Sequence, residues 1–240
     1  MSQKIEIKNS DALLITDIQL DFLPGGALPI LKGDEIIPVL NDYIMRFKDS
    51  KAHILASRDW HPVNHVSFRT QGGPWPPHCI QETLGAKFSP DLKLPSHTMV
   101  ISKATNPEHE AYSAFDGTSL AHELHAMGVK RLFVGGLATD YCVVNTIVDA
   151  RNLGLETTAL MDATLGINAE PGDVDRAVET MLKSGAKQAT ADDFLDAADV
   201  LSMEENQSDA LEKKPLQRAE DNKRARMRPK GSAKRIRTER

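Results

Sequence analysis

The chain has 240 residues, of which 40% are hydrophobic and 26% charged, and its net charge is -5 at pH 7. These values are typical of a soluble globular protein, with enough residues for one large α/β domain and a substantial core. No apolar run approaches the ~20 residues that span a bilayer, so we expect no membrane-spanning segment. The N-terminal residues carry no signal-peptide pattern, and two cysteines make no disulfide framework, so we expect a cytoplasmic protein.

Short apolar runs recur along the chain and predict buried β-strands. Each run is apolar at consecutive positions, a pattern that suits parallel strands covered on both faces. The predicted strands are residues 12–16, 53–56, 98–101, 132–134 and 157–161.

Helical patterns lie between these runs. Apolar residues recur at helical spacing in residues 34–47, 119–127, 143–153 and 174–182, and a glycine follows three of these segments. Strands that alternate with helices predict an α/β fold. We expect a three-layer, doubly wound architecture, in which an open parallel sheet is flanked by helices.

Reactive side chains follow the predicted strands. Asp17, Asp59 and Lys103 come at or just after three strand ends, and the turn to Cys142 follows a fourth. In open α/β sheets ligands bind at the carboxyl ends of the strands. We therefore expect these side chains to meet at one edge of the sheet.

Cys142 follows a glycine-containing turn and precedes a helical run. A helix N-terminus favours a thiolate over a thiol, and its N–H groups can stabilise an oxyanion. Asp17 could then serve as the base and Lys103 could steady the negative charge. The structural alternatives are a small core residue for Cys142, a turn cap for Asp17 and an extended surface lysine for Lys103.

A second cluster combines carboxylate and imidazole groups. The segment from Asp59 contains His61 and His65, and His78 follows further on. These ligand types suit Zn²⁺, Mn²⁺ or Fe²⁺. Two surface histidines near a turn are the structural alternative.

The connection over residues 61–94 is rich in Pro, Gly, His and Trp and has no clear periodicity. Such a long loop in a compact domain is usually functional or disordered, and its tryptophans favour an active-site wall. Phe22 and Trp75 could enclose a flat ring between them, or they could simply anchor loops.

The C-terminal segment differs in composition from the rest. From Lys213 onward there are 12 Lys/Arg and 3 Asp/Glu, whereas the whole chain is acidic. We predict one domain over residues 1–203 and a basic, largely disordered tail over residues 204–240. The tail could bind nucleic acid or an acidic partner, or it could be solvated without a partner.

Several ordered blocks between Ala12 and Phe194 carry a family resemblance. They are residues 17–28, 57–62, 75–79, 103, 112–115 and 136–143. Together they resemble the motifs of the nicotinamidase/pyrazinamidase family, within the isochorismatase-like cysteine hydrolases.

The resemblance implies an amidohydrolase that converts nicotinamide to nicotinate and ammonia, and pyrazinamide to pyrazinoate, through a cysteine thioester in NAD salvage. It implies that Asp17, Lys103 and Cys142 form a catalytic triad. It also implies a non-proline cis peptide between Leu137 and Ala138, which directs the N–H groups of Ala138 and Cys142 at the oxyanion. Enzymes of this fold often self-associate, so a homo-oligomer is possible.

The same resemblance assigns a metal site and a ring pocket. One divalent ion, zinc first with manganese or iron as alternatives, would hold the pyridine nitrogen of the substrate. Phe22 and Trp75 would flank the ring, and Tyr112 would border the pocket. The implied metal ligands are Asp59, His61, His65 and His78.

Some positions depart from the family pattern. Glu82 and Ala104 stand where the family usually has glycine, and Glu110-Ala111 stand where Asp-Ser is frequent. The alternative enzyme is a related hydrolase of another carbamoyl or vinyl-ether substrate, for which Arg58 or Arg69 would have to face the pocket.

Overall fold

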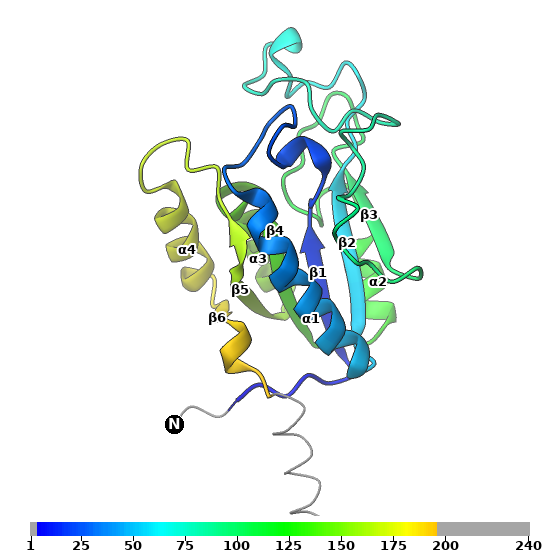
Figure 1. Ribbon diagram of the computed structural model, residues 1–240, viewed down its shortest axis with the longest axis vertical. Coiled ribbons are helices and arrows are strands. Elements are labelled where there is room, and N and C mark those ends of the chain that lie inside the picture. Colours follow the sequence, from blue (N-terminus) through cyan, green and yellow to red (C-terminus); the bar gives the residue numbers. More distant parts are fainter. Residues whose placement is uncertain (1–3, 196–240) are drawn as a thin grey trace, which may run out of the picture. The chain divides into compact units, whose positions relative to one another are not determined.

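Six parallel strands form the central sheet of this computed structural model, which describes residues 4–195 (Figure 1). The strands are β1 (Asp11–Thr16), β2 (His53–Asp59), β3 (Met99–Lys103), β4 (Arg131–Leu137), β5 (Glu156–Leu165) and β6 (Lys187–Ala189). Their order is β3-β2-β1-β4-β5-β6. The chain builds outward from β1 to β3, then returns to the other side of β1, so a topological switch lies between β1 and β4.

Helices cover both faces of the sheet, which confirms the predicted three-layer architecture. The helix α1 (Ile37–Asp49) packs on one face. The helices α2 (Leu120–Ala126), α3 (Val144–Asn152) and α4 (Asp173–Lys183) contribute to the core of the other face. Figure 1 shows α1 in front of the sheet, with α2 and α3 behind it.

The strands are apolar at consecutive positions because helices cover both faces of the sheet. In β1, Leu13 and Ile15 join the core beneath α1, whereas Ala12 and Leu14 join the core beneath the other helices. All six residues of β1 are buried. Because successive side chains of a strand point to opposite faces, a strand covered on both sides is apolar at every position.

The predicted elements match the structure with small differences at their ends. Strand β6 was missed because it contains only Lys187, Gln188 and Ala189, two of them polar and exposed. Short 3₁₀ turns at Leu20–Phe22, Gly33–Ile36, Arg69–Gln71 and Ala191–Asp193 were also missed.

The long connection between β2 and β3 is held in place by isolated β-bridges. Isolated bridges join His61 to Ile80 and Phe68 to Trp75, and a third joins Gln19 to Phe88.

The predicted basic tail over residues 204–240 and its proposed partners lie outside the described residues. Among residues 4–195, no helix has the length and apolar character needed to cross a membrane.

Candidate active site

Four neighbouring strands end at the candidate active site. Asp17 follows β1, Asp59 is the last residue of β2, and Lys103 is the last residue of β3. Cys142 follows β4 in a π-helical turn, Thr139–Val143, that leads into α3. Such π-helical turns are rare in proteins, and those that occur are often found at functional sites.

The approach of β4 to β1 depends on glycine at position 136. Gly136 has a φ of +119°, and a Cβ atom there would collide with the backbone of Thr16. Only glycine combines this φ with so close an approach. The next peptide bond, Leu137–Ala138, is cis, as the resemblance implies.

Lys103 lies at the centre of the site. Its Nζ is 3.0 Å from Asp17 Oδ2, pairs with Asp59 Oδ1, and donates a hydrogen bond to Cys142 Sγ at 3.3 Å. Burial alone would lower the pKa of Lys103, but Asp17 and Asp59 outweigh burial and raise it well above its usual value. A buried ammonium therefore stands between two carboxylates and a thiol.

Asp17 has the environment of a base. Ser57 Oγ donates a hydrogen bond to Oδ1 at 2.6 Å, and Oδ2 faces the Lys103 ammonium at 3.0 Å. Burial raises the pKa of Asp17, with Lys103 opposing that shift and Asp59 adding to it. A carboxylate with a raised pKa holds a proton more readily than an exposed one.

Cys142 is buried beside these groups. One oxygen of Asp17, one oxygen of Asp59 and the sulfur of Cys142 all lie within 4.8 Å of one another. Burial raises the pKa of the Cys142 thiol well above its usual value, although Lys103 lowers it. Burial therefore opposes the thiolate that the helix turn and Lys103 favour.

Asp59, His61 and His78 form a group of possible metal ligands. One ligand atom from each lies within 4.8 Å of the other two. His61 Nδ1 is 3.1 Å from the carbonyl of His78, and His78 Nδ1 is 2.8 Å from the carbonyl of Pro76. Such bonds to carbonyls place the proton on Nδ1 and leave Nε2 as the donor atom for a metal.

The charges of this group also suit a cation. Burial lowers the pKa of His61 to about 4, so its ring is neutral near pH 7, the form that binds metals. Burial raises the pKa of Asp59, but Lys103 and the two histidines outweigh it and hold that pKa below its usual value. The donor set therefore fits a divalent transition metal.

His65 is placed differently from the other predicted ligands. Its Nδ1 is 2.7 Å from Ser67 Oγ, and its Nε2 is 3.0 Å from the carbonyl of His109. It belongs to a second group of possible ligands, with His61 and Glu110. The four predicted donors thus lie in two groups that share His61.

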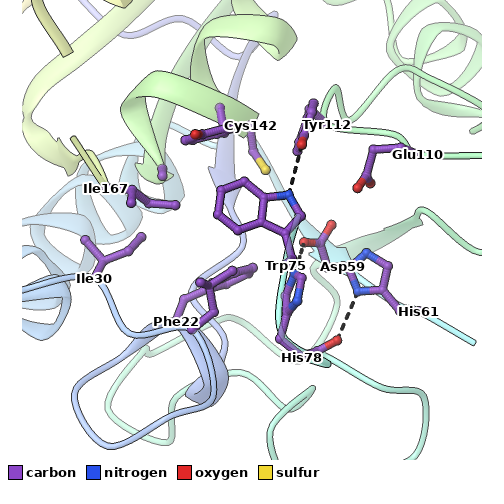
Figure 2. Close-up of a pocket in the computed structure, with 13 residues that line it drawn as sticks. Phe22, Ile30, Asp59, His61, Trp75, His78, Glu110, Tyr112, Cys142 and Ile167 are labelled. Carbon is purple, nitrogen blue, oxygen red and sulfur yellow. Dashed lines mark hydrogen bonds and ion pairs between the residues drawn. The ribbon is translucent and has the colours of Figure 1, made fainter. Parts of the chain in front are cut away.

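A partly open cavity is lined by Cys142. Figure 2 shows Phe22, Trp75, Tyr112 and Cys142 around it, with Asp59 and the histidines along one side. Trp75 Nε1 donates a hydrogen bond to the Tyr112 hydroxyl at 3.0 Å. The lining is Phe22, Leu28, Ile30, Asp59, His61, Trp75, His78, Glu110, Tyr112, Ala138, Tyr141, Cys142 and Ile167.

Several residues of the site were not predicted as such. Tyr141 lines the cavity, and its ring centroid is 5.1 Å from that of Trp75. Its position directly before Cys142 in the sequence could have identified it as a residue of the site. Glu110 also lines the cavity; the sequence marked it only as a departure from the family pattern and not as a site residue.

The side chain of Gln19 stabilises the end of β2, next to the site, through hydrogen bonds. Its side chain donates to the carbonyl of Asp59 at 2.8 Å and to that of Ala86 at 2.9 Å, and it accepts from the Asp59 N–H at 2.8 Å. A fully buried amide with all three bonds fixes the end of β2. Its position two residues after Asp17 could have identified it.

Neither arginine considered for the alternative enzyme lines the cavity. The Arg58 guanidinium lies over the Trp60 ring, 3.6 Å from its centroid, and Arg69 donates to the carbonyl of Pro74. The alternative therefore lacks the cationic side chain that it needs.

Two departures from the family pattern have a backbone explanation. Glu82 has a φ of 64° and Ala104 a φ of 52°. Both are in the left-handed region that glycine adopts without strain. The glycines usual at these positions are thus replaced here by residues that bear a conformational cost.

Comparison with known proteins identifies the family of the chain. The isochorismatase domain family matches residues 11–193. Nicotinamidase from Escherichia coli (strain K12) is 37% identical over 204 residues, which cover 76% of this chain and 96% of that protein.

Two solved structures are also similar to this chain. The pyrazinamidase of Pyrococcus horikoshii, in complex with zinc, is 51% identical with a TM-score of 0.72, over 75% of this chain and 99% of that one. The protein PnC1 from L. infantum, in complex with nicotinate, is 33% identical with a TM-score of 0.73, over 80% of this chain and 98% of that one. The chain belongs to the isochorismatase family and, within it, to the nicotinamidase/pyrazinamidase group.

Proposed function

We propose that this protein hydrolyses nicotinamide to nicotinate and ammonia, and pyrazinamide to pyrazinoate, as a step of NAD salvage. The observation that carries the proposal is the contact of buried Lys103 with both Asp17 and Cys142, because Cys142 lines an aromatic cavity. A nucleophile, a base and a fixed positive charge are the groups that amide hydrolysis through a thioester needs.

The reaction begins with proton transfer. Asp17 Oδ2 accepts the thiol proton of Cys142, and the sulfur attacks the amide carbonyl carbon of the substrate. Lys103 stays protonated and stabilises the negative charge on the sulfur as the proton leaves. Burial raises the pKa of Asp17, which makes this carboxylate a stronger base toward the thiol than an exposed aspartate.

Collapse of the tetrahedral adduct releases ammonia. The carbonyl electrons form the oxyanion, which we place against the N–H groups of Ala138 and Cys142. The carbon–nitrogen bond then breaks, and Asp17 returns its proton to the leaving nitrogen. A water molecule that Asp17 deprotonates attacks the thioester, and the proton returns to the Cys142 sulfur as nicotinate forms.

The cavity selects a flat ring. Phe22 and Trp75 are positioned to contact the ring faces, and Tyr112 borders the same space. Apolar and aromatic lining with few polar groups is typical of small-molecule sites. An aliphatic amide would lose these contacts and should be a poor substrate.

We propose Zn²⁺ as the resident ion, with Asp59, His61 and His78 as its first ligands and His65 as a further predicted one. When bound, the ion would coordinate the pyridine nitrogen and so orient the ring. The support is the neutral imidazole of His61, the carbonyl partners of His61 and His78, and the zinc complex of the Pyrococcus horikoshii pyrazinamidase. We assign this hydrolase domain to residues 1–203 and expect it in the cytoplasm.

The test is ammonia release from nicotinamide by the purified full chain. We expect turnover that falls on chelation and returns when Zn²⁺ is restored. Cys142→Ala should abolish release while nicotinate still binds. Normal ammonia release by Cys142→Ala would contradict the mechanism, and a folded, zinc-loaded protein without turnover would favour another amide substrate.

A further inference from the structure

We propose that Ile167 limits the substituents that the ring of the substrate can carry, and that Asp140 is the positioning residue that holds Ile167 at a fixed place relative to Cys142. The substrates are thereby narrowed to aromatic amides whose ring is unsubstituted on the edge that faces away from the metal-ligand group. This inference rests on the amide hydrolysis and the ring orientation proposed above, and adds to them a determinant of selectivity.

Ile167 lies at the side of the cavity away from the histidines. It lines the cavity together with Ile30, Trp75 and Cys142. Figure 2 shows Ile30 and Ile167 to one side of Trp75 and His61 to the other. A ring whose nitrogen is directed toward His61 therefore has aliphatic side chains at its opposite edge. In nicotinamide that edge consists of ring carbons 4 and 5, where a substituent would meet Ile167.

Both carboxylate oxygens of Asp140 bond to the segment that carries Ile167. Oδ1 accepts the Ile167 N–H at 2.9 Å, and Oδ2 accepts the Asn168 N–H at 2.7 Å. Asp140 itself is part of the π-helical turn, two residues before Cys142. Two charge-assisted hydrogen bonds from one carboxylate fix the orientation of the partner as well as its distance. Asp140 thus sets the position of Ile167 relative to the nucleophile.

The loop after β5 packs closely on this carboxylate. A Cβ atom at Gly166 would lie 2.9 Å from Asp140 Oδ1, closer than side chains normally approach, so glycine permits the contact. One residue pair earlier, the hydroxyls of Thr139 and Thr164 are 2.8 Å apart and both side chains are buried. The loop is therefore joined to the nucleophile turn at Thr164, before Ile167, and again by Asp140 at Ile167 itself.

Asp173 offers a matched control for a purely structural role of Asp140. Its Oδ2 accepts the Glu170 N–H at 2.8 Å, and its Oδ1 pairs with Arg176 at 2.5 Å. These bonds stabilise the α4 end of the same loop, outside the residues that line the cavity. Asp173→Asn should therefore loosen the loop without changing the place of Ile167.

The experiment compares nicotinamide with its 4-methyl and 5-methyl derivatives on the full-length protein. Ammonia release gives the ratio of kcat/KM for nicotinamide to that for each derivative. Loss of folded protein lowers both values equally, so the ratio reports on the cavity alone. We expect Ile167→Ala to lower the ratio about 10-fold or more for at least one derivative, as added space for a methyl group does. Asp140→Asn keeps one acceptor oxygen and should lower it about 3- to 10-fold, the effect of one hydrogen bond.

A double-mutant cycle tests whether Asp140 acts through Ile167. In the Ile167→Ala protein, Asp140→Asn should lower the ratio no further, because the side chain that it positions is gone. Asp173→Asn should keep the wild-type ratio. The ratio for 6-methylnicotinamide, whose methyl group is next to the nitrogen, should be the same in all variants. If Ile167→Ala does not fold, Ile167→Val should give a smaller shift in the same direction.

Unchanged ratios for both derivatives in the Ile167 variants would overturn the ring limit. Additive effects of the two substitutions, or an equal shift in Asp173→Asn, would overturn the positioning role of Asp140. Quenching of tryptophan fluorescence by each amide gives the corresponding ratio of Kd values without turnover. A wild-type protein that releases no ammonia from nicotinamide would therefore remove the proposed reaction, while the Kd ratios would still decide this inference.

Discussion

The ammonium of Lys103 donates to the sulfur of Cys142 at 3.3 Å, across 39 residues of sequence. The same ammonium pairs with the carboxylates of Asp17 and Asp59. One buried cation therefore serves both the nucleophile and the metal-ligand group, and its removal should affect both.

Replacing Lys103 with Gln should lower kcat and stability together. The lost positive charge at the sulfur should reduce kcat by about 10²- to 10³-fold, as the loss of one stabilising donor does in acyl transfer. The two buried carboxylates left behind should lower the free energy of unfolding by about 3–5 kcal/mol. Ammonia release and denaturant unfolding measure the two effects. Lys93→Gln, at an exposed position, is the control, and a fully active Lys103→Gln would exclude the proposed role.

Ser57→Ala should move the acid limb of the pH profile of kcat/KM toward higher pH. The Ser57 hydroxyl stabilises ionised Asp17 and so lowers the pKa of that carboxyl. Without this bond the pKa of Asp17 rises, and the base is protonated up to a higher pH. Since activity requires the ionised base, the loss of activity on acidification should begin earlier. An unshifted acid limb would show that another group controls it.

Tyr112→Phe should weaken substrate binding more than turnover. Removal of the hydroxyl deprives Trp75 Nε1 of its acceptor and loosens a wall of the cavity. Loss of one such hydrogen bond corresponds to a rise in KM of about 3- to 10-fold, with kcat nearly unchanged. Burial raises the pKa of Tyr112 to about 12, so the effect should be the same from pH 6 to pH 9. An effect on kcat alone would contradict this role.

Ala104→Gly should stabilise the protein. At a φ of 52°, an alanine bears a steric cost of about 1–2 kcal/mol that glycine avoids. Part of this gain is offset by the greater freedom of glycine in the unfolded chain, so the expected increase in unfolding free energy is about 1 kcal/mol. The same substitution at Ala121, an exposed position in α2, should instead lower stability by about 1 kcal/mol. Thermal unfolding of both variants gives the comparison.

Much of the fold was predictable because each strand is covered on both faces. The runs that became β1 and β4 are apolar at nearly every position, and Asp17 marks the end of β1, whereas β4 continues through two glycines to Leu137. Strand β6 was not predictable, because it has three residues and takes its place from pairing with β5 rather than from its own composition.

The site was predictable where strand ends supplied its residues. Asp17, Asp59 and Lys103 follow buried runs, and parallel strands bring such ends together. Glu110 was missed because loop geometry, rather than a periodic pattern, places it in the cavity, whereas Tyr141 was missed although it directly precedes Cys142. The burial of Cys142, which raises the pKa of its thiol, had no local sequence signal, because distant segments cause it.

The order β3-β2-β1-β4 has a consequence for synthesis on the ribosome. The first three strands carry Asp17, Asp59 and Lys103, whereas Cys142 follows only after β4 joins the free edge of β1. A nascent chain that ends before β4 carries the lysine and both carboxylates but lacks Cys142, the nucleophile. Since domains fold as units, catalytic competence arises only once the second half of the sheet has docked. Prematurely terminated chains should therefore be inert toward amides.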